Sequence, residues 1–120
     1  MLFDVTQQSL ELGLQGSSLR QQALAQNMAN INTPGYQRVD VDFHSQLRQA
    51  LERTPSGQIA QPNFAPAHPG SDTAVRVDGN TVDIDQESSM MAENALEYQG
   101  YTSLLGLRRR MLLDTMKLNG

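Results

Sequence analysis

Apolar residues recur at helical spacing in the first and last parts of the chain, and this pattern constrains the fold more than any other feature. Residues three, four or seven apart share one face of a helix. The spacing predicts two long helices, over residues 1–31 and 86–118. The main stripes are Phe3, Leu10, Leu14, Leu24, Met28 and Ile31 in the first, and Met91, Tyr98, Leu105 and Leu112 in the second. A second apolar stripe makes the apolar face of each helix wider than one coiled-coil partner needs. The second stripes are Val5, Leu12, Leu19 and Ala23 in the first helix, and Leu104, Leu107, Met111 and Leu118 in the second.

A sequence that stops a helix follows the first of these stripes. Thr33 precedes a proline, which disfavours helical geometry, so the first helix is expected to end at or before it. Pro34 suits the second position of a turn, and Gly35 tolerates the positive φ that the third position of a type II turn requires. Asn30 suits a helix C-terminus. On these residues alone, an ordinary helix stop before Tyr36 is a sufficient explanation.

The segment between the two predicted helices is irregular. Alternation predicts an extended segment over 36–42, and Phe43, Leu47 and Leu51 predict a short helix over about 42–53. Four prolines and two glycines make 54–73 a loop. Alternating valines around Asp78-Gly79-Asn80 predict a small β element over 75–84.

We therefore expect a mainly α fold in three parts. Residues 1–35 and 86–120 form the long helices, paired as an antiparallel coiled-coil hairpin. Residues 36–85 form the middle segment, with the short helix, the Pro/Gly-rich loop and the small β element. Gly13 and Gly16 weaken the first helix by roughly 1 kcal/mol each relative to alanine, yet they allow close packing.

Composition excludes several classes of function. The net charge of −4 gives no reason to expect nucleic acid as a partner. No run of about twenty apolar residues is present, and the N-terminus lacks the pattern of a cleavable signal peptide. Without cysteine there is neither a disulfide nor thiolate chemistry. His44 and His68 lack metal-ligand spacing, so we assign them no chemistry.

A run of acidic residues near the second helix could bind a hard cation or act as an acid–base pair. It contains Asp78, Asp83, Asp85 and Glu87, but it lacks the spacing of an EF-hand. The stronger interpretation is a solvated segment in which Asp83 or Asp85 caps the helix and Glu87 favours its positive end.

Three stretches of the chain resemble the bacterial flagellar basal-body rod proteins. The first contains Gln22, Leu24, Asn27, Ala29-Asn30, Thr33-Pro34-Gly35-Tyr36 and Arg38. The second is the run from Asp78 to Glu87, which is similar to the segment before the C-terminal helix of the proximal rod members, and the third, Ala92 to Gln99, is similar to the opening of that helix. The resemblance covers about half of the residues. Ser88-Ser89-Met90-Met91 departs from it, because this stretch carries less charge than the family pattern.

The resemblance implies a structural subunit of the proximal rod that is not an enzyme and needs no cofactor, metal or small-molecule substrate. It implies export without a cleavable signal peptide through the flagellar export apparatus, and assembly in the periplasm into a helical tube that transmits torque and lines the export channel. The implied partners are copies of the chain, other rod proteins, and the inner-membrane ring with its rod adaptor protein. Subunit packing is expected at Leu10, Leu14, Leu24, Met28, Ile31, Tyr98, Leu105 and Leu112. The turn is expected to set the angle between the first helix and the segment that follows it, which we call the outer segment. The turn residues are Asn30, Thr33, Pro34, Gly35 and Tyr36.

Burial energetics support a protein that is completed by its neighbours. Each large apolar side chain removed from water contributes about 1.5–3 kcal/mol, and the middle segment is expected to be too short to cover the second stripes. Two alternative functions remain open on the sequence alone. A small cytosolic helical chaperone or adaptor would bind a client helix along the stripes, and an enzyme would use Asp83, Asp85 and Glu87 as a metal site.

Overall fold

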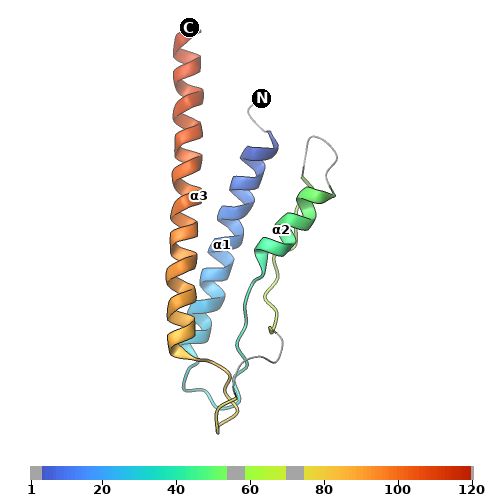
Figure 1. Ribbon diagram of the computed structural model, residues 1–120, viewed down its shortest axis with the longest axis vertical. Helices are drawn as coiled ribbons and strands as arrows, with labels where there is room; N and C mark the ends of the chain where they lie inside the picture. Colours follow the sequence, from blue (N-terminus) through green and yellow to red (C-terminus); the bar gives the residue numbers. More distant parts are fainter. Residues whose placement is uncertain (1–3, 54–58, 70–74, 120) are drawn as a thin grey trace.

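In a computed structural model of the chain, the described residues form three helices joined by extended segments in an elongated arrangement (Figure 1), with principal extents of 66 × 27 × 16 Å. The structure describes residues 4–53, 59–69 and 75–119. α1 spans Val5–Ala29, α2 spans Phe43–Glu52 and α3 spans Ile84–Leu118. The two long helices, α1 and α3, lie side by side and run in opposite directions, and α2 packs on the other side of α1 (Figure 1). The chain is therefore mainly helical, with its N- and C-terminal helices packed together, as predicted.

Capping residues next to the helix mark both ends of α1. Asp4 is the N-cap, and its carboxylate accepts a hydrogen bond from the backbone N–H of Gln7. The helix ends at Ala29 with Asn30 as its C-cap, at a φ of −105° that is not left-handed. The predicted turn follows, because the N–H of Tyr36 donates to the carbonyl of Thr33 at 3.2 Å and Gly35 has a φ of +73°.

α1 is shorter than the predicted range 1–31, and the other two helices begin within two residues of their predicted starts. Asp42 caps α2, and Asp83 caps α3 by accepting hydrogen bonds from the backbone N–H groups of Asp85 and Gln86. Lys117 lies in the last turn of α3, where a cation complements the helix dipole. Within the described ranges, every helix is too short or too polar to cross a membrane.

The hydrophobic core lies between α1, α2 and the extended segment 59–69. Its buried members are Leu12, Ala23, Val41, Phe43, Ala50, Ile59 and Phe64. Leu12 and Ala23 belong to the second stripe of α1, so the expectation that the middle segment cannot cover this stripe is wrong. The physical reason is that the middle segment supplies bulky side chains: Phe43 from α2, and Ile59 and Phe64 from a stretch whose prolines indicated only a loop.

The predicted small β element over 75–84 is not formed, because the described residues 75–83 contain no strand. The Asp78-Gly79-Asn80 turn is present, with Gly79 at a φ of +80°. One hydrogen bond, from the N–H of Arg76 to the carbonyl of Asn80, joins its flanks without forming a strand. The segment bonds instead to the turn after α1, since the N–H of Gly35 donates to the carbonyl of Asp78 and the N–H of Thr81 donates to that of Tyr36.

The predicted Pro/Gly-rich loop is only partly described. Residues 54–58 and 70–74 lie outside the described residues, and 59–69 is extended without helix. One antiparallel bridge joins this segment to the chain after the first turn. In it, Asp40 and Ala67 exchange backbone hydrogen bonds of 3.0 and 2.9 Å.

Candidate functional site

The residues expected to pack between subunits lie along α1 and α3 with very different exposure. Leu24 is fully buried within the chain. Tyr98 is 42% exposed. The others, Leu10, Leu14, Met28, Ile31, Leu105 and Leu112, are half-buried. Leu24 is therefore inaccessible to a partner in this structure, whereas Tyr98 presents its ring on the surface.

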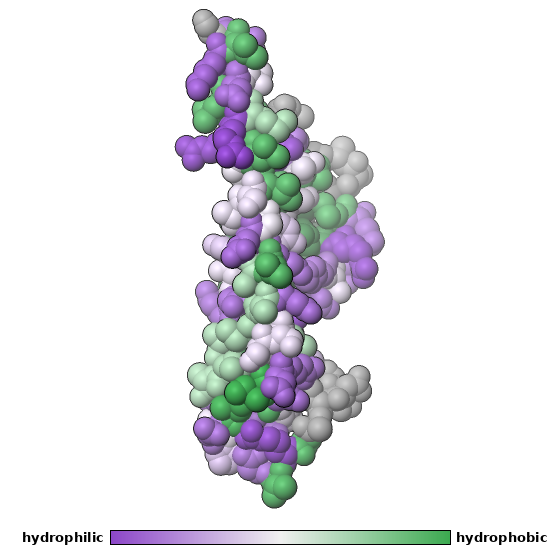
Figure 2. Space-filling view, turned by 60° about the vertical axis from the view of Figure 1, so that its left-hand side comes forward, coloured by the Kyte–Doolittle hydropathy of each residue, from purple (hydrophilic) through white to green (hydrophobic). Residues whose placement is uncertain are grey.

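Further apolar side chains are exposed along the C-terminal half of α3. They are Leu104, Leu107, Met111, Leu113, Met116 and Leu118, with exposures of 45–87%. In the space-filling view, hydrophobic areas alternate with hydrophilic ones over much of this face of the molecule (Figure 2). Single exposed apolar residues are ordinary on protein surfaces, but a repeated set along one helix indicates a contact surface.

The turn after α1 is held by a side chain that the sequence analysis treated only as a turn residue. Asn80 is fully buried, and its Nδ2 donates to the carbonyls of Asn30, Ile31 and Thr33 at 2.9, 3.2 and 2.7 Å. It thereby binds the carbonyl of the C-cap residue, which has no intrahelical partner, together with two carbonyls of the turn that follows. The five residues predicted to form the turn are thus joined to the segment that leads into α3. Pro34 and Gly35 are exposed, and Gly35 has open space where a Cβ would lie.

A buried polar cluster of Asn27, Arg38 and Glu87 lies where α1, the outer segment and α3 meet. Arg38 Nε donates to Glu87 Oε1 at 2.5 Å, although Arg38 is 4% and Glu87 0% exposed. Asn27 Nδ2 donates to Glu87 Oε2 and to the carbonyl of Val39, and its Oδ1 accepts from the N–H of Val39. Removing one partner of such a pair leaves a buried charge uncompensated, which costs about 3–5 kcal/mol. The cluster therefore joins three distant segments.

This cluster corrects the interpretation of Glu87 as a solvated charge beside the helix dipole. Its partner, Arg38, is 49 residues away along the chain, so local sequence could not identify the pair. The signal in the sequence was that all three residues belong to stretches that resemble rod proteins, Asn27 and Arg38 to the first and Glu87 to the second. Burial raises the pKa of the Tyr36 hydroxyl, whose proton is donated to Asn27 Oδ1, and the charge of Glu87 adds to this shift.

Asp83, Asp85 and Glu87 do not converge on a common point. The Asp83 carboxylate accepts backbone hydrogen bonds at the start of α3, and the Glu87 carboxylate faces Arg38. Among the described residues there is no group of three or more histidine, cysteine or acidic side chains that could hold a metal ion. The acidic run is therefore used for helix capping and ion pairing.

Two glycines allow α1 to approach its neighbours closely. A Cβ added to Gly13 would lie 2.5 Å from the ring of Tyr101 on α3, and one added to Gly16 would lie 2.6 Å from the ring of Phe43 on α2. Real Cβ contacts essentially never reach such distances. These positions therefore need glycine for packing, which confirms the prediction of close approach.

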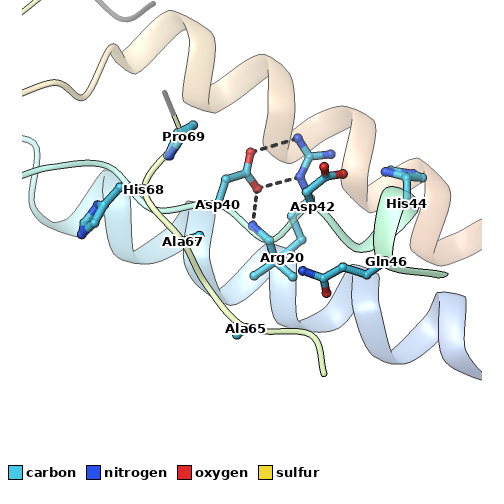
Figure 3. Close-up of a pocket in the computed structure, with 10 residues that line it drawn as sticks. Arg20, Asp40, Asp42, His44, Gln46, Ala65, Ala67, His68 and Pro69 are labelled. Carbon is cyan, nitrogen blue, oxygen red and sulfur yellow. Dashed lines mark hydrogen bonds and ion pairs between the residues drawn. The ribbon is translucent and has the colours of Figure 1, made fainter. Parts of the chain in front are cut away.

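A pocket of about 360 Å³ lies between α1, the start of α2 and the extended segment (Figure 3). Most polar side chains in it are already engaged within the chain. Arg20 binds Asp40 at 2.9 Å, and this pairing outweighs burial and raises the pKa of the guanidinium. His44 pairs with Glu97, and His68 Nδ1 contacts the carbonyl of Arg38. This arrangement stabilises the fold and offers no set of residues poised for catalysis.

Comparison with known proteins identifies the family. No family model matches the chain. Three relatives are each called flagellar basal body rod protein FlgB. The protein of Salmonella typhimurium is 36% identical over 114 residues, covering 82% of this chain and 83% of its own. That of Yersinia enterocolitica is 38% identical over 114 residues with the same coverage, and that of Bacillus subtilis is 32% identical over 107 residues, covering 82% of each chain. The chain belongs to the FlgB family of flagellar basal body rod proteins.

Proposed function

We propose that the chain is a structural subunit of the proximal rod of the bacterial flagellar basal body and that it assembles through its terminal helices. Membership of the FlgB family makes it a structural protein and not an enzyme. Membership also decides against the alternative of a cytosolic chaperone that holds a client helix.

The observation that carries the proposal is the exposed apolar surface of α3. Its side chains cannot be covered by α2, which packs on α1, and they lie along a molecule 66 Å long. Each large apolar side chain that a neighbour covers contributes up to about 1.5–3 kcal/mol. Contacts between different surfaces of identical subunits generate a helical filament when the rotation does not close a ring. An elongated subunit with such a surface is suited to a tube.

The further details of assembly rest on the resemblance to rod proteins. In this proposal α1 and α3 pair as an antiparallel coiled-coil hairpin of residues 1–35 and 86–120, and residues 36–85 lie outside it. The hairpins form the wall of the export channel and transmit torque. The neighbours are copies of the chain and other rod proteins, with the inner-membrane ring and its adaptor at the base. The subunit reaches the periplasmic rod through the flagellar export apparatus without a cleavable signal peptide.

The test places a charge on the exposed face of α3 without disturbing the interior. Leu107 and Met111 are 45% and 59% exposed, so Leu107→Asp and Met111→Asp should leave the helical content of the purified chain unchanged. In a strain lacking the native gene, both variants should be synthesised normally, should be missing from purified basal bodies and should abolish swimming.

The matched control is Thr102→Asp, which adds the same charge at an exposed polar position of α3 on the side of the helix away from Leu107 and Met111. It should support wild-type swimming. Normal swimming with both Leu107→Asp and Met111→Asp would refute assembly through this face, and circular dichroism separates that outcome from a failure to fold.

A further inference from the structure

The residues of α3 that face α1 form a polar line at steps of seven, which we call the polar seam. It consists of Glu87, Asn94, Tyr101 and Arg108. Glu87 and Asn94 are the buried residues of α3 among those described, and both are 0% exposed. The apolar series Met91, Tyr98, Leu105 and Leu112, which sequence alone indicated as the contact line, is displaced from the seam by four residues. Polar chemistry therefore lies where an ordinary helix pair would place leucine.

The first two members of the seam bond to the second half of α1. Glu87 accepts from Asn27 at 3.1 Å. Asn94 Nδ2 donates to the carbonyl of Ser17 at 2.7 Å and to Gln21 Oε1 at 2.8 Å. These hydrogen bonds connect side chains whose positions on α1 and α3 change in opposite directions, as antiparallel pairing requires.

The other two members match the first half of α1. The ring of Tyr101 fills the space that Gly13 leaves free of a Cβ. Arg108 donates to Asp4 Oδ2 at 2.7 Å and to Gln7 Oε1 at 3.2 Å. Each member of the seam thus meets a different set of partners on α1: an amide for Glu87, a backbone carbonyl and an amide for Asn94, a glycine for Tyr101, and a carboxylate and an amide for Arg108.

Asn94 shows that the seam does not simply maximise stability. Its Oδ1 atom is buried and has no hydrogen-bond partner. A buried polar atom without a partner is unfavourable, and an apolar residue of similar size would avoid that cost. The best-attested use of a buried polar residue in a helix pair is to specify register.

We propose that the polar seam specifies the register and direction of α3 on α1. Apolar residues at steps of seven are interchangeable, because a slip of one heptad places each on the position of the next. Such a slip moves α3 by about 10 Å along its axis. The seam has no such redundancy, since a slip of one heptad sets Glu87 against the site of Asn94 and Asn94 against the site of Tyr101. Correct register then fixes which apolar side chains of α3 remain outside.

The experiment measures the register directly in the full-length chain. The chain contains no cysteine, so cysteines introduced at the exposed positions Ala25 and Gln99 can be spin-labelled specifically. Pulsed electron paramagnetic resonance should give one narrow distance distribution for the otherwise unchanged chain. Asn94→Leu should add a second peak to the distance distribution, at the distance expected after a slip of one heptad. The urea concentration at which half of the chain is unfolded should stay the same or rise. Asn94→Ala removes the same amide without added volume and should also lose the single population.

The matched control is Glu93→Leu, which changes the adjacent exposed residue of α3 and should keep one narrow distribution. A single unshifted distance in both Asn94 variants would overturn the proposal, and so would a broad distribution in the labelled chain without further substitution. A lower urea midpoint with one unshifted distance would assign Asn94 a purely stabilising role. Because these measurements use the isolated chain, they are independent of whether the α3 face assembles into the rod.

Discussion

Replacing Gly16 with alanine tests the close packing of α1 against α2 at a single atom. Two effects of opposite sign are involved. Alanine is favoured over glycine in a helix by about 1 kcal/mol. The added Cβ, however, would lie 2.6–2.7 Å from three atoms of Phe43, a fully buried core residue that has no room to withdraw. Overpacking of this kind costs about 1–3 kcal/mol.

The chain offers a control with the same chemistry and no steric conflict. Gly106 lies within α3, and a Cβ built on it meets nothing within 4 Å. Gly106→Ala should therefore raise the free energy of unfolding by about 1 kcal/mol. Gly16→Ala should fall short of that value by about 1–3 kcal/mol, which is the overpacking cost. The difference between the two variants cancels helix propensity and isolates the contact.

Urea unfolding followed by circular dichroism measures both variants. The slope of the free energy against urea should be the same for both, so that midpoints can be compared. If Gly16→Ala stabilised the chain as much as Gly106→Ala, then α1 and α2 would not approach as closely as the structure shows. The explanation of why α1 tolerates a glycine in its interior would then be wrong.

Two further predictions concern the ends of α1. Asn80→Ala should lower the free energy of unfolding by about 1–3 kcal/mol, because the buried backbone N–H two residues further on loses its acceptor and the carbonyls after α1 lose one donor. Asn63→Ala, at an exposed position, should change it by less than about 0.5 kcal/mol. At the other end, the backbone N–H of Gln7, followed by Arg108, holds the pKa of Asp4 below its usual value against a smaller opposing effect of burial. This contribution to stability is present above the unfolded-state pKa and is lost as the pH falls through the lower folded-state value, so Asp4→Asn should reduce the slope of stability against pH in the acid range.

Local features of the fold could be predicted because their causes lie within a few residues. The Thr33–Tyr36 turn depends on a proline and a glycine in adjacent positions, and the start of α3 depends on the capping carboxylate of Asp83. The short helix α2 follows from apolar residues four apart. In each case the residues that determine the structure lie within or next to the element itself in the sequence.

The parts that could not be predicted depend on partners far away in the chain. Asn80 could not be recognised as the residue that holds the end of α1, because its acceptors lie 47–50 residues earlier. The small β element was predicted from alternation, but its backbone groups bond to the first turn. Periodicity also selected the apolar line of α3 over the polar one, since hydrophobicity alone does not indicate that Glu87 and Asn94 are buried.

The last part of α3 extends beyond the part of α1 that the structure describes. Asp4, the cap of α1, pairs with Arg108, and α3 continues through residues 109–118, all but one of them exposed (Figure 1). A helix shorter than about 12–15 residues is marginal in water when nothing packs against it. This stretch will fray from its C-terminus in the dilute chain, and the amide protons of its last turns will exchange faster with solvent than those beside α1. Contact with a neighbouring subunit will slow that exchange. The exchange rate of the amide protons of residues 109–118 will therefore distinguish the assembled subunit from the free chain.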